Sequence, residues 1–400
     1  MALTPVEEAL AILLADAKAP QRHEQVALDA AFGRILATDI YAAIDVPPAA
    51  NSAMDGYAVR AADITSGKFL TVSQRIAAGA VGVPLASGSA ARIFTGAEIP
   101  PGADAVVMQE NCRQSDAGIT VEVAPQVGEN VRPRGQDIRA GDLLVASGSH
   151  VRAVDIALLA SVGIERVAVF PPLVVSIFST GDELVEPGQP LLPGQIYNSN
   201  RPLLTGLLRE LGCNVRDLGI VRDNAHDTAE MLRAAVADSD CVISTGGVSA
   251  GEEDHVRVQL EQLGTLKLWK LNIKPGKPLA YGRLQNTPFF GLPGNPVSVM
   301  VTFELFARPA LWKMAGRRDH ELARRQVRAG VTQDIAHAPP RREYVRAWTE
   351  QKDGQFVSTP TGRQGSGILR SLTLANSLLI VPETSTGIAA GEEADVLLLE

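Results

Sequence analysis

Helical and strand patterns occupy separate blocks of this chain. Apolar residues at helical spacing predict helices over 4–17 and 28–40, and Thr4-Pro5 is typical of a helix start, with threonine as the cap and proline in the first turn. Further along, short apolar runs separated by turn residues predict strands. Their ranges are 69–76, 91–95, 105–109, 119–123 and 143–145. We therefore expect a β-rich lobe over about 50–140, followed by a helix over 153–162.

Beyond Pro171-Pro172, strands and helices alternate. The predicted strands cover 173–179, 214–221, 241–244 and 266–271, followed by a hairpin-like pair at 279–284 and 288–291. The predicted helices cover 201–211, 253–263 and 297–311, with another opened by the capping-box pattern at 227–230. Alternation of this length predicts a parallel sheet with helices on both faces.

The last block is rich in strands again. Strand patterns cover 342–350, 355–358, 377–381 and 394–399, and Asp353-Gly354 between the first two is a hairpin turn signal. The chain thus divides into an N-terminal region over 1–170, an α/β domain over 171–318 and a β domain over 319–400. We predict an α/β multidomain fold with a central parallel α/β domain, a β-rich N-terminal lobe and a small C-terminal β domain.

Composition narrows the class of protein. The 400 residues carry a formal net charge of −8, which argues against a nucleic-acid surface, because such surfaces need clustered Lys and Arg. The cysteines, Cys112, Cys213 and Cys241, lie far apart, so neither a zinc site nor a disulfide framework is expected. The N-terminus lacks the pattern of a signal peptide, and no apolar run reaches spanning length. We expect a cytoplasmic protein without a membrane partner.

One glycine-rich loop follows a short apolar strand at 241–254. The loop has the layout of a phosphate cradle, since backbone N–H groups at a helix N-terminus favour anions. A Walker A loop would have Gly-Lys-Ser/Thr where this chain has Gly251-Glu252-Glu253. Acidic side chains cannot bind a phosphate directly, but they can hold a divalent cation that does. The loop therefore predicts a phosphorylated ligand bound through a metal ion, with Asp254 as one ligand.

Chemically active residues follow the other predicted strands as well. Because ligands of open α/β sheets bind beyond the carboxyl ends of the strands, these groups should meet at one edge. They are Thr180-Gly181-Asp182-Glu183, Arg222-Asp223, Lys274 with Lys277, and Pro293-Gly294-Asn295-Pro296. Carboxylates and lysines together suit a Mg²⁺–phosphate site. Any single acid is also explained as a favourable charge at a helix N-terminus.

These stretches, in this order, resemble the molybdopterin molybdenumtransferase (MoeA) family, which includes the gephyrin E-domain. The resemblance extends from about residue 5 to residue 398. The stretches that carry it are 48–58 (PAANSAMDGYA), 94–97 (FTGA) with 101–107 (PGADAVV), 134–138 (RGQDI), 180–184 (TGDEL), 245–249 (TGGVS) with Asp254, 274–278 (KPGKP) and 292–298 (LPGNPVS).

The resemblance implies a fold of four parts. Two form the N-terminal half, one of them the protruding β-rich lobe. The third is the α/β molybdopterin-binding domain and the fourth a small β-barrel-like domain. It also implies a homodimer, with each site lying between the α/β domain of one subunit and the lobe of the other.

The implied reaction uses adenylylated molybdopterin and molybdate. Mg²⁺-dependent cleavage releases AMP, and molybdenum is placed on the pterin dithiolene. By family position the catalytic residues are Asp55, Thr95, Glu183, Asp223, Asp254, Lys274 and Lys277, with Glu183, Asp223 and Asp254 as metal ligands. The expected substrate-binding residues are Thr180, Gly181, Asp182, Thr245, Gly246, Gly247, Ser249, Gly251, Pro293, Gly294, Asn295, Pro296, Arg134 and Ser371. The stretch 365–367 resembles further C-terminal substrate contacts, and Arg134, Arg346, Arg363 and Arg370 are candidate donors to molybdate.

Two other readings remain open at this stage. One is a different enzyme built on the same α/β domain, either a molybdopterin adenylyltransferase or a CinA-like pyrophosphatase; the stretches 48–58 and 94–107 argue against both. The other is a molybdopterin-binding scaffold that has lost its chemistry, which the intact acids and lysines argue against. The residue types do not separate molybdate from tungstate, because both are tetrahedral dianions of similar size.

Overall fold

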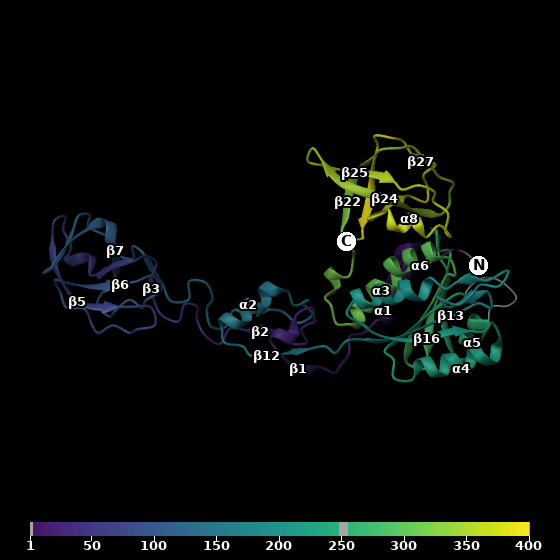
Figure 1. Cartoon of the computed structure of the whole chain (residues 1–400), viewed down its shortest axis with the longest axis horizontal. Coiled ribbons are helices and arrows are strands. Elements are labelled where there is room, and N and C mark those ends of the chain that lie inside the picture. Colours follow the sequence, from purple (N-terminus) through teal and green to yellow (C-terminus); the bar gives the residue numbers. More distant parts are fainter. Residues whose placement is uncertain (1–2, 248–254, 400) are drawn as a thin grey trace.

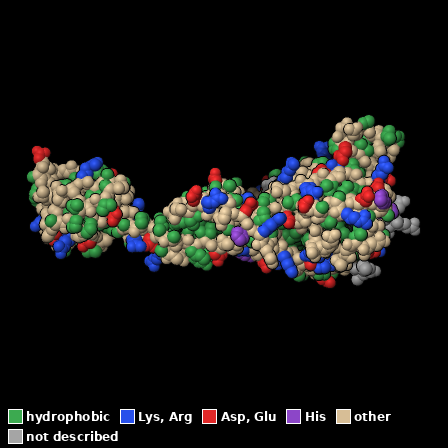
Figure 2. All heavy atoms as spheres, turned by 90° about the horizontal axis from the view of Figure 1, so that it is seen from below, with side chains coloured by type: hydrophobic (Ala, Val, Ile, Leu, Met, Phe, Trp, Pro, Cys, Tyr) green, Lys and Arg blue, Asp and Glu red, His purple; other side chains and the backbone are tan. Residues whose placement is uncertain are grey.

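The molecule is elongated, with its parts arranged in a row (Figure 1). The structure is a computed structural model that describes residues 3–247 and 255–399. A β-rich lobe lies at one end, a small module containing α2 (Ala153–Ser161) lies in the middle, and the α/β domain with the C-terminal β domain beside it lies at the other end. The face shown in Figure 2 carries interspersed acidic and basic side chains, with a narrow connection between the lobe and the middle module.

The lobe is a six-stranded sheet, which confirms the predicted β-rich lobe. Its strand order is β7-β4-β6-β5-β9-β8. The strands are β4 (Gly56–Val59), β5 (Phe69–Ile76), β6 (Ser89–Ile93), β7 (Ala105–Met108), β8 (Cys112–Ser115) and β9 (Gly118–Val121). Small apolar side chains such as Ala58 and Val106 are fully buried in a cluster with Ile93, so the lobe has a hydrophobic core of its own.

The middle module is built from pairs of short strands, β1 (Glu24–Ala27) with β12 (Arg166–Val169) and β2 (Ile40–Tyr41) with β11 (Leu143–Val145). A further pair, β3 (Asn51–Ser52) with β10 (Val131–Arg132), lies at the lobe (Figure 1). The two arms of the chain that lead to the lobe and back thus pair along their length.

The predicted helix over 28–40 is wrong. Only the short 3-10 turn η1 (Asp29–Ala31) forms there. Gly33, at φ +75°, breaks the helical path, and Ile35 and Leu36 then form bridges to His150 and Val169. Leu36 is fully buried as a result, so contacts with residues more than 100 positions away replace the local helix.

The α/β domain contains a mixed six-stranded sheet in the order β16-β13-β17-β21-β20-β18. Its strands are β13 (Val174–Thr180), β16 (Asn214–Val221), β17 (Cys241–Thr245), β18 (Gly264–Lys270), β20 (Pro278–Leu284) and β21 (Thr287–Leu292). The first four in the order, β16 to β21, are parallel, as predicted. β20 and β21 form the predicted hairpin, and its reversal makes β20 antiparallel to both neighbours.

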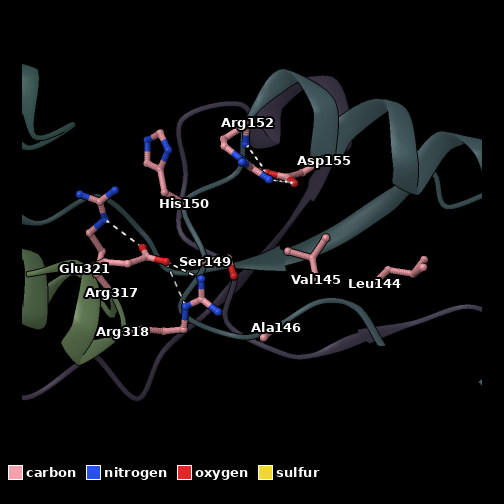
Figure 3. Close-up of a pocket in the computed structure, with 10 residues that line it drawn as sticks. All are labelled: Leu144, Val145, Ala146, Ser149, His150, Arg152, Asp155, Arg317, Arg318 and Glu321. Carbon is pink, nitrogen blue, oxygen red and sulfur yellow. Dashed lines mark hydrogen bonds and ion pairs between the residues drawn. The ribbon is translucent and has the colours of Figure 1, made fainter. Parts of the chain in front are cut away.

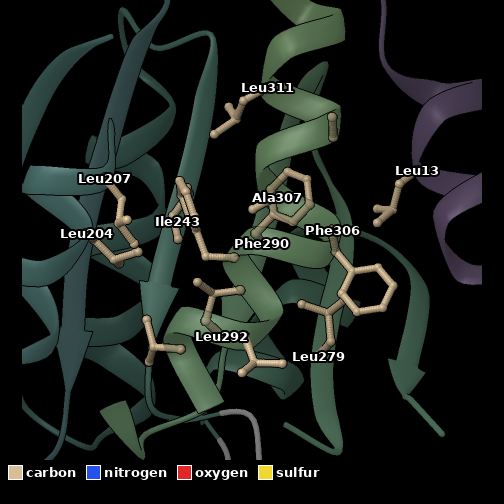
Figure 4. Packing of buried hydrophobic residues seen from close by; sticks show 14 of the residues in the cluster. Leu13, Leu204, Leu207, Ile243, Leu279, Phe290, Leu292, Phe306, Ala307 and Leu311 are labelled. Atoms are coloured by element: carbon tan, nitrogen blue, oxygen red, sulfur yellow. The ribbon is translucent and has the colours of Figure 1, made fainter. Parts of the chain in front are cut away.

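Helices cover both faces of this sheet, as predicted. They are α3 (Asn200–Glu210), α4 (Ala225–Val236), α5 (His255–Leu263), α6 (Pro296–Thr302), the π-helical turn η4 (Phe303–Ala307) and α7 (Arg308–Met314). Successive side chains of β17 alternate between the two cores: Ile243 packs with α3, α6 and α7, and Val242 packs with α4 and α5. Figure 4 shows the first core, in which Phe290 and Phe306 lie between the sheet and the helices.

The N-terminal helix α1 (Val6–Asp16) belongs to this core rather than to the lobe. Its Leu13 is fully buried against the helices that follow β21. The predicted cap is wrong, because Pro5 occupies the cap position without a side-chain bond. Thr4 instead makes backbone hydrogen bonds to residue 270, the last of β18, and to residue 272, just beyond it. Similarly, α4 is capped by Asn224, whose side chain accepts from the Asp227 N–H, and not by a box opening at Asp227.

The C-terminal domain is a closed barrel of five strands. Its strands are β22 (Gln326–Val331), β24 (Arg342–Lys352), β25 (Gln355–Pro360), β26 (Ser377–Val381) and β28 (Glu393–Leu398), and the pairing of β24 with β26 closes it. Asp353 and Gly354 both have positive φ, which confirms the predicted hairpin turn. A short strand from the α/β domain, β19 (Ile273–Lys274), adds to β24. Across the described parts of the chain, helices stay too short or too polar to span a membrane.

Candidate functional site

The carboxyl ends of the parallel strands meet at one edge of the α/β sheet. Thr180 of β13 lies opposite Val221 of β16, and Ser179 lies opposite Thr245 of β17. Thr245 in turn lies opposite Leu292 of β21. The segments that follow these strands therefore emerge side by side, as the strand-edge rule predicts.

Gly246 and Gly247 form a turn that only glycine fits. Both have positive φ, +85° and +63°. A Cβ on Gly246 would lie 2.5 Å from the Thr180 carbonyl oxygen, and one on Gly247 would lie 2.8 Å from Thr180 Oγ1. Thr180 is 4% exposed, and its hydroxyl has no hydrogen-bond partner among the described residues. The turn thus places backbone without side chains next to a buried hydroxyl that makes no hydrogen bond to the described residues. This arrangement suits a ligand that approaches the backbone closely.

Two of the predicted acids lie on neighbouring loops at this edge. Asp182 accepts a hydrogen bond from the Asp223 backbone N–H at 3.1 Å, which joins the loops after β13 and β16. The exposed Glu183 side chain folds back over Gly181, whose missing Cβ would lie 2.7 Å from its carboxylate. Within 3–247 and 255–399, no three His, Cys, Asp or Glu residues gather closely enough to hold a metal. Asp254, Ser249 and Gly251 lie outside the described residues.

The loop over 293–296 closes another side of the edge. Asn295 donates from Nδ2 to Ser366 Oγ at 3.1 Å, and the Val297 N–H donates to the Ser366 carbonyl at 3.2 Å. Pro296 begins α6 directly after this loop. The barrel loop around Ser366 therefore lies against the strand edge, where the resemblance places the stretch 365–367.

Two buried asparagines at this edge were not identified from the sequence. Asn200, 8% exposed, donates from Nδ2 to the Gly294 carbonyl at 2.6 Å, and Asn198, 2% exposed, accepts from the first backbone N–H groups of α3. The amide nitrogen of Asn198 and the amide oxygen of Asn200 have no partner within the described part of the chain. A signal was present in the sequence, since two asparagines spaced by two stand directly before the predicted helix over 201–211.

The two predicted lysines differ in their surroundings. Lys274 Nζ lies 2.9 Å from Glu343 Oε1 of the barrel, with 45% of its side chain exposed. Lys277 is exposed, and no ion pair is present for it among the described residues. Of the two lysines, Lys277 is the one whose ammonium group has no counter-charge within residues 3–247 and 255–399.

Arg346 and Ser371 are both buried beneath a loop of the barrel. Arg346 is 1% exposed and donates from Nε to Ser371 Oγ at 3.1 Å and from Nη2 to the carbonyls of Arg363 and Gly365. Burial lowers the pKa of Arg346 to about 10. Ser371, 3% exposed, also donates to the Ile368 carbonyl. These two residues brace the loop that carries Ser366, and direct contact with a ligand stays a prediction for both.

Asp55 and Thr95 come together in the lobe. Asp55 Oδ1 accepts from both the backbone N–H and the hydroxyl of Thr95, each at 2.8 Å. The Thr95 backbone N–H, with its hydroxyl, holds the pKa of Asp55 below its usual value. In Figure 1 the lobe and the α/β sheet occupy opposite ends of the molecule. One chain therefore does not bring this pair to its own strand edge.

Arg134 belongs to the N-terminal region and not to the α/β domain. It lies between β10 and β11, where its exposed guanidinium pairs with Asp45 at 2.5 Å. A bond from the Ala140 backbone N–H and the Arg134 side chain lower the pKa of Asp45. The residue groups with the lobe rather than with the strand edge.

A cavity of about 450 Å³ lies elsewhere, between the middle module and the end of α7 (Figure 3). Its charges are largely paired internally. Arg152 bonds Asp155 at 2.9 Å, and Arg318 bonds Glu321. Burial and the nearby Arg317 lower the pKa of His150. The cavity lacks the glycine turn and the strand ends, so we assign the site to the sheet edge.

Comparisons with known proteins cover the whole chain. Residues 4–163 match the MoeA N-terminal region (domain I and II), residues 176–313 match a probable molybdopterin binding domain, and residues 328–399 match the MoeA C-terminal region (domain IV). A molybdopterin molybdenumtransferase of Haemophilus influenzae is 38% identical over 98% of this chain and 97% of its own length. One from Nostoc sp. is 39% identical over 95% and 89%.

Solved structures agree with the sequence matches. A structure of the molybdopterin biosynthesis MoeA protein from Pyrococcus horikoshii has a TM-score of 0.87 and 34% identity, with all of both chains covered. A second structure of that protein gives a TM-score of 0.86 and 33% identity, over 99% of this chain and 100% of the other. The chain belongs to the molybdopterin molybdenumtransferase (MoeA) family.

Proposed function

We propose that this protein is a molybdopterin molybdotransferase of molybdenum cofactor biosynthesis. Its substrates are adenylylated molybdopterin and molybdate, and it places molybdenum on the pterin dithiolene with release of AMP. Relatives that match nearly their full length carry the name of this activity.

The proposal rests mainly on the ends of the parallel strands, which meet at one edge of the sheet. The Gly246–Gly247 turn, the 293–296 loop and the Thr180 hydroxyl lie together at one edge, and this hydroxyl has no partner in the described part of the chain. A phosphate-bearing ligand needs close-lying backbone N–H groups and polar donors, which this edge offers. The buried amides of Asn198 and Asn200 add unused polar groups for a heterocycle such as a pterin.

The donor set also fits Mg²⁺. Glu183 and Asp223 supply carboxylate oxygens on neighbouring loops, and Mg²⁺ is commonly held by one or two carboxylates together with water and substrate phosphate. When bound, the ion would neutralise phosphate charge. Lys277 is exposed and can direct its ammonium group at the leaving phosphate. Cleavage of a phosphoanhydride depends mainly on such charge stabilisation.

We propose that the lobe contributes to the site of a second copy of the chain. Asp55 and Thr95 are functional candidates that lie at the opposite end of the molecule from the strand edge. In a homodimer with two-fold symmetry, the lobe of each copy would reach the edge of the other, and each site would draw once on each chain. We therefore propose a homodimer as the active form.

Release of AMP tests the proposed function. Purified protein incubated with adenylylated molybdopterin, Mg²⁺ and molybdate should release AMP, and omission of molybdate or Mg²⁺ should suppress it. Binding of the pterin nucleotide without AMP release would instead favour the scaffold alternative. Matches to the N-terminal and C-terminal MoeA regions argue against the adenylyltransferase and pyrophosphatase alternatives.

A further inference from the structure

A chain of buried contacts leads from the barrel to Lys274. Glu343 of β24 is 6% exposed, and its Oε1 accepts from Lys274 Nζ at 2.9 Å. Its other oxygen, Oε2, lies 2.9 Å from Nδ1 of His337. The His337 side chain is fully buried. A carboxylate in such surroundings is stable only when both oxygens are hydrogen-bonded, and these two partners supply that.

The backbone fixes the same junction. β19 pairs with β24 so that Lys274 lies directly opposite Glu343. The Arg342 N–H also donates to the Asn272 carbonyl at 3.1 Å. The lysine and the carboxylate are therefore held in register by hydrogen bonds between the two domains, and their contact does not depend on two flexible side chains finding each other.

His337 has a defined part in this arrangement. An ionised carboxylate only accepts hydrogen bonds, so the Nδ1 atom of His337 must donate. The Nε2 atom has no partner among the described residues. His337 thus serves one contact, the second oxygen of Glu343, and leaves the first oxygen to Lys274.

We propose that Glu343, supported by His337, is a positioning residue for Lys274, and that the C-terminal barrel acts on the reaction through this carboxylate without touching the substrate. The inference rests on the proposed function and on the catalytic role that the family resemblance implies for Lys274. An ammonium group has three N–H donors. One is used by Glu343, and two remain for substrate oxygens on the 45% of the side chain that is exposed.

The test combines Glu343→Gln with Lys274→Gln. Gln keeps the shape of the side chain and removes its charge. We expect Glu343→Gln to lower kcat for AMP release about tenfold, because misplacing a catalytic group costs rate, with a smaller change in KM. In the Lys274→Gln background the same substitution should have no further effect, because it acts only through that lysine. An unchanged kcat, or an equal loss in both backgrounds, would overturn the proposal.

Glu383→Gln is the matched control. Glu383 pairs with Arg342, the residue before Glu343 on β24, at 2.9 Å. The variant removes an ion pair at the same domain junction without touching Lys274. It should keep the wild-type kcat, and a loss equal to that of Glu343→Gln would mean that the junction acts only as a structural tie.

Lysine reactivity in the wild-type protein gives a second readout that needs no variant. Lys274 should react with acetic anhydride more slowly than Lys277, as followed by mass spectrometry of peptides, because its ammonium is held by Glu343. Equal rates would refute the positioning by themselves. Absence of AMP release by the wild type would refute the proposed function, and slower reaction of Lys274 than of Lys277 would then still agree with the contact between Lys274 and Glu343.

Discussion

Adding one methyl group at Gly246 should damage the strand edge in a way that a matched glycine elsewhere does not. Gly246 has φ +85°, and its Cβ would lie 2.5 Å from the Thr180 carbonyl oxygen. Gly194 has nearly the same φ, +87°, but an added Cβ would meet no atom within 4 Å. Gly194→Ala therefore isolates the cost of the left-handed backbone, and Gly246→Ala adds the collision.

The expected magnitudes follow from these two costs. A non-glycine residue in the left-handed region costs about 1–2 kcal/mol, and forcing atoms into a packed site costs about 1–3 kcal/mol. Gly194→Ala should lower the free energy of unfolding by the first amount only, and Gly246→Ala should lower it by the sum of both. Because the collision is with backbone, the end of β13 must shift, and we expect AMP release to fall in Gly246→Ala but not in Gly194→Ala.

Scanning calorimetry measures the difference. For a unit of 150–250 residues, 1 kcal/mol corresponds to roughly 2–4 °C in Tm. The transition that contains the α/β domain should therefore drop at least 2 °C further, roughly, in Gly246→Ala than in Gly194→Ala. Equal Tm values and equal AMP release in the two variants would refute the close approach of Gly246 to Thr180.

Three further predictions concern assembly, catalysis and pH. Asp254→Asn should abolish Mg²⁺-dependent AMP release without unfolding the protein, and mixing it with Asp55→Ala should restore about one intact site per heterodimer; a monomer in sedimentation, or no complementation, would contradict this. Lys277→Gln should lower kcat on the order of 10²-fold at saturating substrate, whereas a raised KM with wild-type kcat would make it a binding residue only. The Arg342 side chain holds the pKa of Glu383 below its usual 4.5. The wild type should therefore be more stable than Glu383→Gln above pH 4.5, and this difference should disappear as the pH falls through the lowered pKa. Urea unfolding from pH 7 to pH 3 measures the difference, and a difference that grows on acidification would refute the prediction.

The sequence predicted those parts of the fold that depend on local pattern. The alternation after Pro171 placed the strands of the α/β sheet within a few residues, because each strand is a short apolar run between turn residues. The helix over 28–40 was wrong because its apolar residues serve strand-like pairing with His150 and Val169, which are distant in sequence. Gly33, which follows the short 3-10 turn with φ +75°, does not have the backbone conformation of a right-handed helix.

The position of the candidate site at the strand edge could be predicted from the sequence. The contacts between domains that hold its residues could not. The strand-edge rule located Thr180, Asp223 and Gly246 together, since each follows a predicted parallel strand. The contact between Asp55 and Thr95 agrees with their shared place in the lobe, which came from the family resemblance. The pairing of Lys274 with Glu343 joins different domains, so no local pattern could show it.

Long-range hydrogen bonds also decide the place of Arg346. As an arginine in a strand pattern, it was a candidate donor to molybdate. The fold buries its guanidinium under the loop over 361–371 and uses its donors on Ser371 and on backbone carbonyls. Its function as a brace depends on the path of that loop, which the residue type alone does not specify.

The stoichiometry of a single turnover tests the central claim most directly. Protein, adenylylated molybdopterin, Mg²⁺ and molybdate are mixed, and AMP and pterin-bound molybdenum are measured in the same sample. A transferase that couples cleavage to insertion should give equal amounts of the two, and both should be lost in Glu183→Gln. AMP release that proceeds equally well without molybdate, or with no molybdenum on the pterin, would contradict the account.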